Sequence, residues 1–249
     1  MHRENGFIKP HPTRYNKMFK KSTALCILAV ATAAIFAACQ KQTPQKTSAP
    51  SNTASRSAAS AVSSSTSSAA ASSSASSFPA PESDPLYVKA YGYYAADRYD
   101  DAISVCNQAL AANPNCFWAY NVKGIATYFA NGNSAAASCL NLIDKSTTID
   151  PDYSYGYFNK ALIQKGLKDW NDSLANFNKV LALKPGDTWS YYGIATVYAD
   201  TDQTDQALQY LKLAIDTDPS GVKAQVQDDM NRHFSRLKDD PRFQALVGS

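Results

Sequence analysis

Four prolines recur at nearly equal intervals between residues 114 and 219. Pro114, Pro151, Pro185 and Pro219 each follow an apolar run, and they are spaced 37, 34 and 34 residues apart. Proline lacks the N–H that a helix interior needs and disfavours helical backbone at the residue before it, so each proline indicates the end of a helix. A repeat near 34 residues has room for two helices and two turns, which predicts a solenoid of helical hairpins.

Small residues recur at fixed places between these prolines. In the first predicted helix of each unit they are Ala90, Gly124, Ala161 and Ala195. In the second predicted helix they are Ala102, Ala136, Ser173 and Ala207. Large apolar residues then follow at three- and four-residue spacing along the second helices, as on one face of an amphipathic helix. Two helices approach closely only where side chains are short, so these positions predict where the helices of each hairpin cross.

The pattern from about Ser83 to Gly221 resembles the tetratricopeptide repeat. The segments AYNVKG (119–124), GYFNKA (156–161) and SYYGIA (190–195) carry the first-helix part, and DDAISVCNQALAANP (100–114) and TDQALQYLKLAIDTDP (204–219) carry the second-helix part. The resemblance implies an all-α, right-handed α-solenoid of about four hairpins with a C-terminal capping helix. The expected units are 83–116, 117–153, 154–187 and 188–221, followed by a capping helix and tail over 222–249.

Two segments depart from the regular period. The second unit is three residues longer than the others, and we expect the extra residues in the helix that precedes Pro151. Residues 221–237 carry apolar side chains at mostly four-residue steps, which predicts one capping helix that covers the last hairpin. Pro241 predicts the start of one further short helical turn, because proline is favoured at the first position of a helix.

The N-terminal residues 1–39 have the form of an export signal. Lys20 and Lys21 precede a 17-residue run, Ser22–Ala38, that is mostly Ala, Leu, Ile and Val and is short for a membrane-spanning helix. Its end, Ile35-Phe36-Ala37-Ala38-Cys39, resembles the lipobox of bacterial lipoproteins, which implies lipidation of Cys39 and a membrane anchor. Phe36 departs from the usual Leu, and an uncleaved anchor or ordinary secretion are the alternatives. We expect the true start at Met18, since residues 1–17 are polar.

Residues 40–82 form a Ser/Ala-rich segment of low complexity. Of its 43 residues, 15 are Ser and 10 are Ala, and four prolines interrupt it. No regular apolar spacing is present to build a core, so the segment is predicted to be a disordered linker. A flexible chain of this length spans roughly 35 Å on average, enough to hold a domain away from a membrane surface.

Charge and chemistry narrow the function of the folded part. From Ser83 onward there are 15 Lys and Arg against 19 Asp and Glu, a net charge of −4, which argues against nucleic-acid binding. Only His233 remains as a histidine beyond residue 17, and no metal-ligand spacing, nucleophile elbow or phosphate loop is present. We therefore expect no cofactor, no metal and no enzyme activity. Cys106, Cys116 and Cys139 favour buried free thiols, with one disulfide as the alternative.

The resemblance also implies where a partner binds. First helices of tetratricopeptide proteins line a concave groove, and the matching positions here are strongly aromatic. The groove residues expected from this alignment are Tyr87, Tyr91, Tyr94, Trp118, Asn121, Tyr128, Tyr155, Phe158, Trp189 and Tyr192. Lys165, Thr196 and Asp200 occupy further groove-facing positions. Aromatic anchors are typical of binding hot spots, so we expect an extended or helical peptide with apolar residues as the ligand, although some of these rings could instead pack between helices.

These features favour an exported, lipid-anchored scaffold or adaptor, with the domain facing the periplasm or the cell exterior and a protein or peptide in its groove. An assembly lipoprotein of an outer-membrane machine, such as a pilus or a protein-insertion complex, is the alternative, since Gln40 after Cys39 permits outer-membrane sorting. Binding or turnover of an envelope polymer is a weaker hypothesis.

Overall fold

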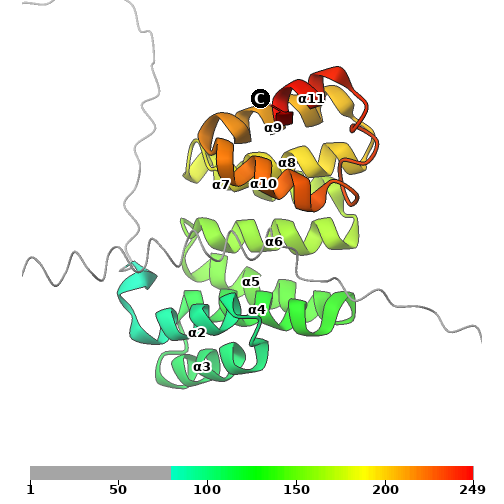
Figure 1. Cartoon of the computed structure of the whole chain (residues 1–249). Coiled ribbons are helices and arrows are strands. Elements are labelled where there is room, and N and C mark those ends of the chain that lie inside the picture. Colours follow the sequence, from blue (N-terminus) through cyan, green and yellow to red (C-terminus); the bar gives the residue numbers. More distant parts are fainter. Residues whose placement is uncertain (1–79, 249) are drawn as a thin grey trace, which may run out of the picture.

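The computed structural model describes residues 80–248, and every regular element in that range is helical. The hairpins are α2 (Pro85–Ala95) with α3 (Tyr99–Ala112), α4 (Phe117–Asn131) with α5 (Ala136–Ile149), α6 (Ser154–Leu167) with α7 (Trp170–Leu183), and α8 (Thr188–Asp200) with α9 (Thr204–Thr217). The short helix η2 (Pro81–Ser83) precedes them, and α10 (Pro219–Asp229) and α11 (Pro241–Gly248) follow. Figure 1 shows the helices stacked in one direction from α2 to α11, so the all-α solenoid predicted from the sequence is confirmed.

The prolines end helices as expected. Each of α3, α5, α7 and α9 stops two residues before its proline. Acidic side chains cap two of the helices that follow these prolines, Asp187 for α8 and Asp218 for α10, and Asp84 caps α2 by accepting a hydrogen bond from the backbone N–H of Leu86 at 2.8 Å. Each such cap is worth about 1 kcal/mol of helix stability. The linkers between hairpins are therefore set by local chemistry.

The turn inside each hairpin contains one residue with a positive φ angle. These residues are Asp97, Gly132, Lys168 and Asp202, with φ between 60° and 68°. A residue with positive φ ends the first helix and reverses the chain within a few residues. Only one of the four is glycine, so packing of the hairpins holds the other three in a geometry that their side chains disfavour.

Small side chains lie where the helices of each hairpin cross. Ala90, Ala161 and Ala195 on the first helices are fully buried, and so are Ala102, Ser173 and Ala207 on the second helices. The Ser173 hydroxyl donates to the carbonyl of Ala161 across one such crossing, at 2.9 Å. The predicted crossing point of α6 and α7 is therefore confirmed, whereas in the second hairpin Gly124 lies against Ile143 and Cys139 of α5.

The first helices form the inner layer of the stack. α2 contacts α4, α4 contacts α6 and α6 contacts α8, and these contacts are closer than those between successive second helices. The second helices therefore spread apart on the outside. Two apolar cores run through the stack, one from α2 to α6 and one from α6 to α11, and α6 contributes Ile163 to the first and Phe158 to the second.

The structure corrects two expectations. The three extra residues of the second unit lie before α5, at the end of α4 and in the short helix η3 (Gly132–Ala135), and α5 has the same length as α3. The capping helix α10 ends at Asp229, and residues 230–239 form turns. The chain leaves the helix there so that Phe234 packs between the rings of Tyr192 and Phe243, and this burial overrides the helical spacing of the sequence. α11 does begin at Pro241, as predicted.

The signal segment, Met18, Cys39 and the linker over 40–79 lie outside the described residues. Between residues 80 and 248, none of the helices combines the length and apolar character needed to cross a bilayer.

Two glycines in first helices provide a matched test of this packing. A Cβ at Gly193 would collide with the ring of Phe177, which is fully buried, whereas a Cβ at Gly92 would meet nothing. We expect Gly193→Ala to lower the free energy of unfolding by about 1–3 kcal/mol through overpacking. Gly92→Ala is expected to raise it by about 0.5–1 kcal/mol, since alanine is favoured over glycine in a helix. Urea denaturation followed by circular dichroism measures both, and a Gly193→Ala domain as stable as the parent would contradict the proposed close crossing of α7 and α8.

Candidate partner-binding face

The ten predicted groove residues lie on the first helices and are more buried than the sequence suggests. Nine of them are no more than 7% exposed, and Tyr155 is half-buried. We expected rings open to solvent, but in the structure they pack largely against one another. The exposure that the sequence predicted is therefore wrong in extent, and whether these residues bind a partner stays a prediction.

In the first half of the stack the rings form a continuous layer. Tyr87 stacks on Tyr91 at a centroid distance of 5.7 Å and meets Trp118 edge-on at 5.5 Å. Tyr91 contacts Tyr94 at 5.9 Å, and Tyr94 contacts Phe129 at 6.1 Å. Aromatic pairs of this kind contribute about 0.5–1.5 kcal/mol each beyond burial. These ring contacts thus join α2 to α4, and the edge of the ring layer lies on the inner face of the stack.

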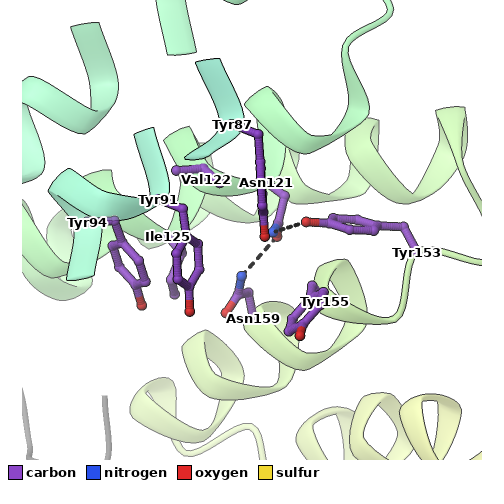
Figure 2. A pocket seen from close by; sticks show the side chains of 9 residues that line it. All are labelled: Tyr87, Tyr91, Tyr94, Asn121, Val122, Ile125, Tyr153, Tyr155 and Asn159. Carbon is purple, nitrogen blue, oxygen red and sulfur yellow. Dashed lines mark hydrogen bonds between the residues drawn. The ribbon is translucent and has the colours of Figure 1, made fainter. Parts of the chain in front are cut away.

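A narrow pocket lies along this edge (Figure 2). Figure 2 shows the hydroxyl ends of Tyr91 and Tyr94 pointing the same way, away from α2 and toward α6. Tyr155 and Asn159 of α6 line the opposite side. The cavity volume is about 10 Å³, room for about one water molecule. The lining of this pocket is therefore mostly apolar, from the tyrosine rings, Val122 and Ile125, and phenol hydroxyls and amides add a smaller polar part.

A buried polar network forms the floor of the pocket. The Asn159 amide donates to the Asn121 carbonyl oxygen at 3.0 Å, and the Asn121 amide donates to the Tyr153 hydroxyl at 3.4 Å. Trp118 donates through its indole N–H to Asp84 at 3.2 Å. Asn121 and Trp118, both predicted to contact a partner, therefore hold neighbouring helices together. Tyr153 and Asn159 were missed by the alignment, although an aromatic residue just before a first helix was a usable signal.

Burial fixes the protonation of the innermost phenols. It raises the pKa of Tyr87 and of Tyr153 well above the ordinary value, and the neighbouring tyrosines add to the effect. Both hydroxyls therefore stay neutral and remain able to donate and accept hydrogen bonds. Because the folded pKa values are raised, the stability that this provides is complete below the unfolded pKa of about 10 and is lost as the pH rises above it.

The remaining predicted residues lie in different surroundings. Phe158 meets Phe177 of α7 edge-on at 5.5 Å, which places its ring in the core of the third hairpin. Tyr128 donates to Asn133 at 2.9 Å. Trp189 meets the ring of Tyr192 at 5.9 Å. Of the ten predicted residues, the structure thus brings five around one pocket, and the other five lie elsewhere on the first helices. The five at the pocket are Tyr87, Tyr91, Tyr94, Asn121 and Tyr155.

The three cysteines of the domain are buried free thiols. Burial raises the pKa of Cys106 to about 12 and that of Cys116 to about 11, so neither forms a reactive thiolate near neutral pH. Over residues 80–248, no group of His, Cys, Asp and Glu side chains is arranged to hold a metal ion.

Comparison with known proteins agrees with this geometry. A tetratricopeptide-repeat family model matches residues 190–220, which include most of α8 and all of α9. The fold is similar to that of TTC0263, a tetratricopeptide protein of Thermus thermophilus, with a TM-score of 0.52 at 18% identity, covering 60% of this chain and 79% of that one. Residues 190–220 thus match a tetratricopeptide repeat, and the described part of the chain has a tetratricopeptide-like helical solenoid fold.

A second solved structure with a similar outline is MamA from Desulfovibrio magneticus, with a TM-score of 0.45 at 17% identity, covering 64% of this chain and 94% of that one. No curated protein matches the sequence. The tetratricopeptide fold therefore rests on the family model and the Thermus protein, and the chemistry of the face has to be argued from this chain's own residues.

The polar floor of the pocket can be tested by substitution. Asn121→Ala leaves the buried Asn159 amide without its acceptor, and we expect the free energy of unfolding to fall by about 1–3 kcal/mol. Asn107→Ala is the control, because Asn107 is exposed and bonds only Lys123 on the surface, and a change within about 0.5 kcal/mol is expected. Chemical denaturation of both variants measures the difference. Equal stability of the two would show that the network does not hold α4 to α6.

Proposed function

We propose that this chain is a membrane-anchored cell-envelope lipoprotein whose tetratricopeptide face binds a protein or peptide partner as a scaffold or adaptor. The tetratricopeptide scaffold implies protein–protein interaction and is typically non-catalytic. The observation that carries the binding site is the inner pocket, where tyrosine hydroxyls of α2 face Tyr155 and Asn159 of α6.

The anchor is argued from sequence. Cys39 directly follows the 17-residue apolar run Ser22–Ala38, and it is followed in turn by the 43 residues of low complexity at 40–82. A diacylglycerol on Cys39 would add about 0.8 kcal/mol of membrane affinity for each buried methylene, which is enough for firm anchoring when several chains are attached. The linker would then hold the solenoid clear of the head groups while leaving its inner face free to meet another protein.

The pocket indicates the chemistry of the partner. The row of hydroxyls and amides on Tyr91, Tyr94, Tyr155 and Asn159 suits a peptide backbone, which offers alternating donors and acceptors. Neighbouring rings supply an apolar edge for side chains. A partner segment with apolar residues, lying along the inner face, satisfies both. The net charge of −4 from Ser83 onward favours a partner that is not strongly acidic.

Assembly of an outer-membrane machine, such as a pilus or an insertion complex, is a narrower version of the same role. Gln40 following Cys39 favours it, because this residue permits sorting to an outer membrane. Binding or hydrolysis of an envelope polymer would instead place sugar rings against the faces of the tyrosine rings. Capture of glycan in the crosslinking experiment below would favour this alternative.

The anchor predicts a simple labelling result. Cells fed an alkyne fatty acid should label the wild-type protein, and Cys39→Ser should abolish the label and release the protein from the membrane fraction. Cys116→Ser is the matched control, because Cys116 is a buried thiol of the folded domain and should leave the label unchanged. Equal labelling of wild type and Cys39→Ser would contradict lipidation at this residue.

The inner face predicts where a partner is captured. A photoreactive residue at Tyr155, which is half-buried at the pocket, should crosslink a protein in cells, whereas the same residue at exposed Gln108 on α3 should not. Tyr155→Ala should reduce recovery of that partner at least tenfold with the fold intact, and Tyr210→Ala, a half-buried tyrosine of α9, should not. Equal capture from Gln108 would contradict the site. Capture of glycan in place of protein would favour polymer binding.

A further inference from the structure

Residues 230–237, which follow α10, lie across the first-helix face of the last two repeats. His233 Nδ1 is 2.8 Å from Asp200 Oδ1 at the end of α8, and His233 Nε2 is 3.5 Å from Lys165 Nζ in the last turn of α6. One side chain therefore joins two repeats. Phe234 lies beneath it, fully buried, against the ring of Tyr192.

These contacts fall on positions that a partner would use. Lys165, Tyr192, Thr196 and Asp200 are all groove-facing in the tetratricopeptide alignment. In the structure Lys165 donates to Thr196 at 2.7 Å, and Tyr192 donates to Asp229 at the end of α10 at 2.9 Å. The chain's own C-terminal segment thus covers the inner face at one end of the stack, while the pocket around Tyr91 and Tyr155 lies at the other.

Burial lowers the pKa of His233 and, together with the Lys165 ammonium, favours the neutral imidazole. The Lys165 ammonium can only donate, so Nε2 accepts, and the ring proton on Nδ1 donates to Asp200. The imidazole is therefore neutral when the segment is docked. A second proton on Nε2 would face the Lys165 ammonium at close range and remove the acceptor.

The docked state also carries an unmet cost. Asp229 and Gln225 on α10 are buried, and within residues 80–248 the Oδ1 atom of Asp229 and the Oε1 atom of Gln225 have no hydrogen-bond partner. Buried acceptors without donors cost free energy, which lowers the net stability of the packing of α10 from which residues 230–237 follow. The outer contacts, Arg236 with Asp202 and Arg242 with Asp205, lie at the exposed surface, where ion pairs contribute little. The net free energy that holds residues 230–237 against the inner face is therefore smaller than the burial of Phe234 alone would give.

We propose that residues 230–237 are an autoinhibitory latch, held closed by His233 between Asp200 and Lys165, which a partner must displace to use the inner face of the last two repeats. The proposal rests on the proposed function for the identity of the site, and the latch itself is a property of the chain alone. The occupant that competes with the latch is the peptide segment of the partner.

The latch should respond to pH. Burial lowers the pKa of His233, the Lys165 ammonium lowers it further, and Asp200 and Asp229 oppose this in part. Lys165 itself is flanked by Thr196, Asp200, Asp229 and Arg232. Because the docked pKa is depressed below the ordinary 6.5, the stability of the docked state is complete above that pH and is lost as the pH falls. Acid therefore favours the open latch.

Hydrogen–deuterium exchange of the full chain tests the latch without any partner. In His233→Ala, amides of residues 230–237 should exchange at least tenfold faster than in wild type at pH 7.5, with exchange in α2–α5 unchanged. Lys212→Ala is the control, because it removes an exposed ion pair on α9 at a distance from the latch. Exchange within twofold of wild type in His233→Ala would overturn the proposal.

A second variant guards against loss of folding. Lys165→Met keeps the apolar stem and removes the ammonium, so it should also open the latch, and it should reduce the difference in exchange between pH 7.5 and pH 5.5 that the wild type shows. A wild-type segment whose exchange, corrected for intrinsic rates, does not change with pH would overturn the pH response.

Recovery of the crosslinked partner should rise in His233→Ala. An unchanged recovery would overturn the inhibitory role. Absence of any crosslinked partner in both proteins would contradict the proposed function, and the latch would then be tested by the exchange measurement alone.

Discussion

The close approach of two helices at a pair of short side chains is the constraint on which this domain depends. Ala161 meets Ser173, and equivalent small residues recur in the other hairpins, each buried at the crossing point. Any larger side chain there would push the helices apart and change the angle at which the next hairpin packs. Since each hairpin contacts mainly its neighbours, an error at one crossing would propagate along the stack.

This packing places the first helices inside and the second helices outside. The inner face then gathers aromatic side chains that a single hairpin could not bury, and they pack edge to face in place of standing open. The narrow pocket at the surface of this layer is lined mostly by apolar ring atoms, Val122 and Ile125, together with phenol hydroxyls and asparagine amides. At the other end the C-terminal segment occupies the same face through His233. The proposed binding surface and the segment proposed to compete for it therefore both result from the same packing of the helices.

The sequence predicted the features that local chemistry controls. Proline spacing and small residues located the hairpins, and Pro241 located the start of α11. The sequence-based prediction was wrong where contacts between distant residues override the local spacing of apolar residues. The apolar spacing over 221–237 is helical, yet burial of Phe234 against Tyr192 ends α10 at Asp229. Exposure of the rings could not be predicted either, because it depends on contacts between repeats that alignment to one repeat does not contain.

The central claim is that the inner face of the first helices holds a protein partner. The most direct measurement is deuterium uptake of the domain alone and in complex with the protein captured in cells. The account predicts that the partner slows exchange in α2, α4 and α6 and around Tyr155, with the outer helices α3, α5 and α7 unchanged. Slowed exchange confined to those outer helices would contradict it.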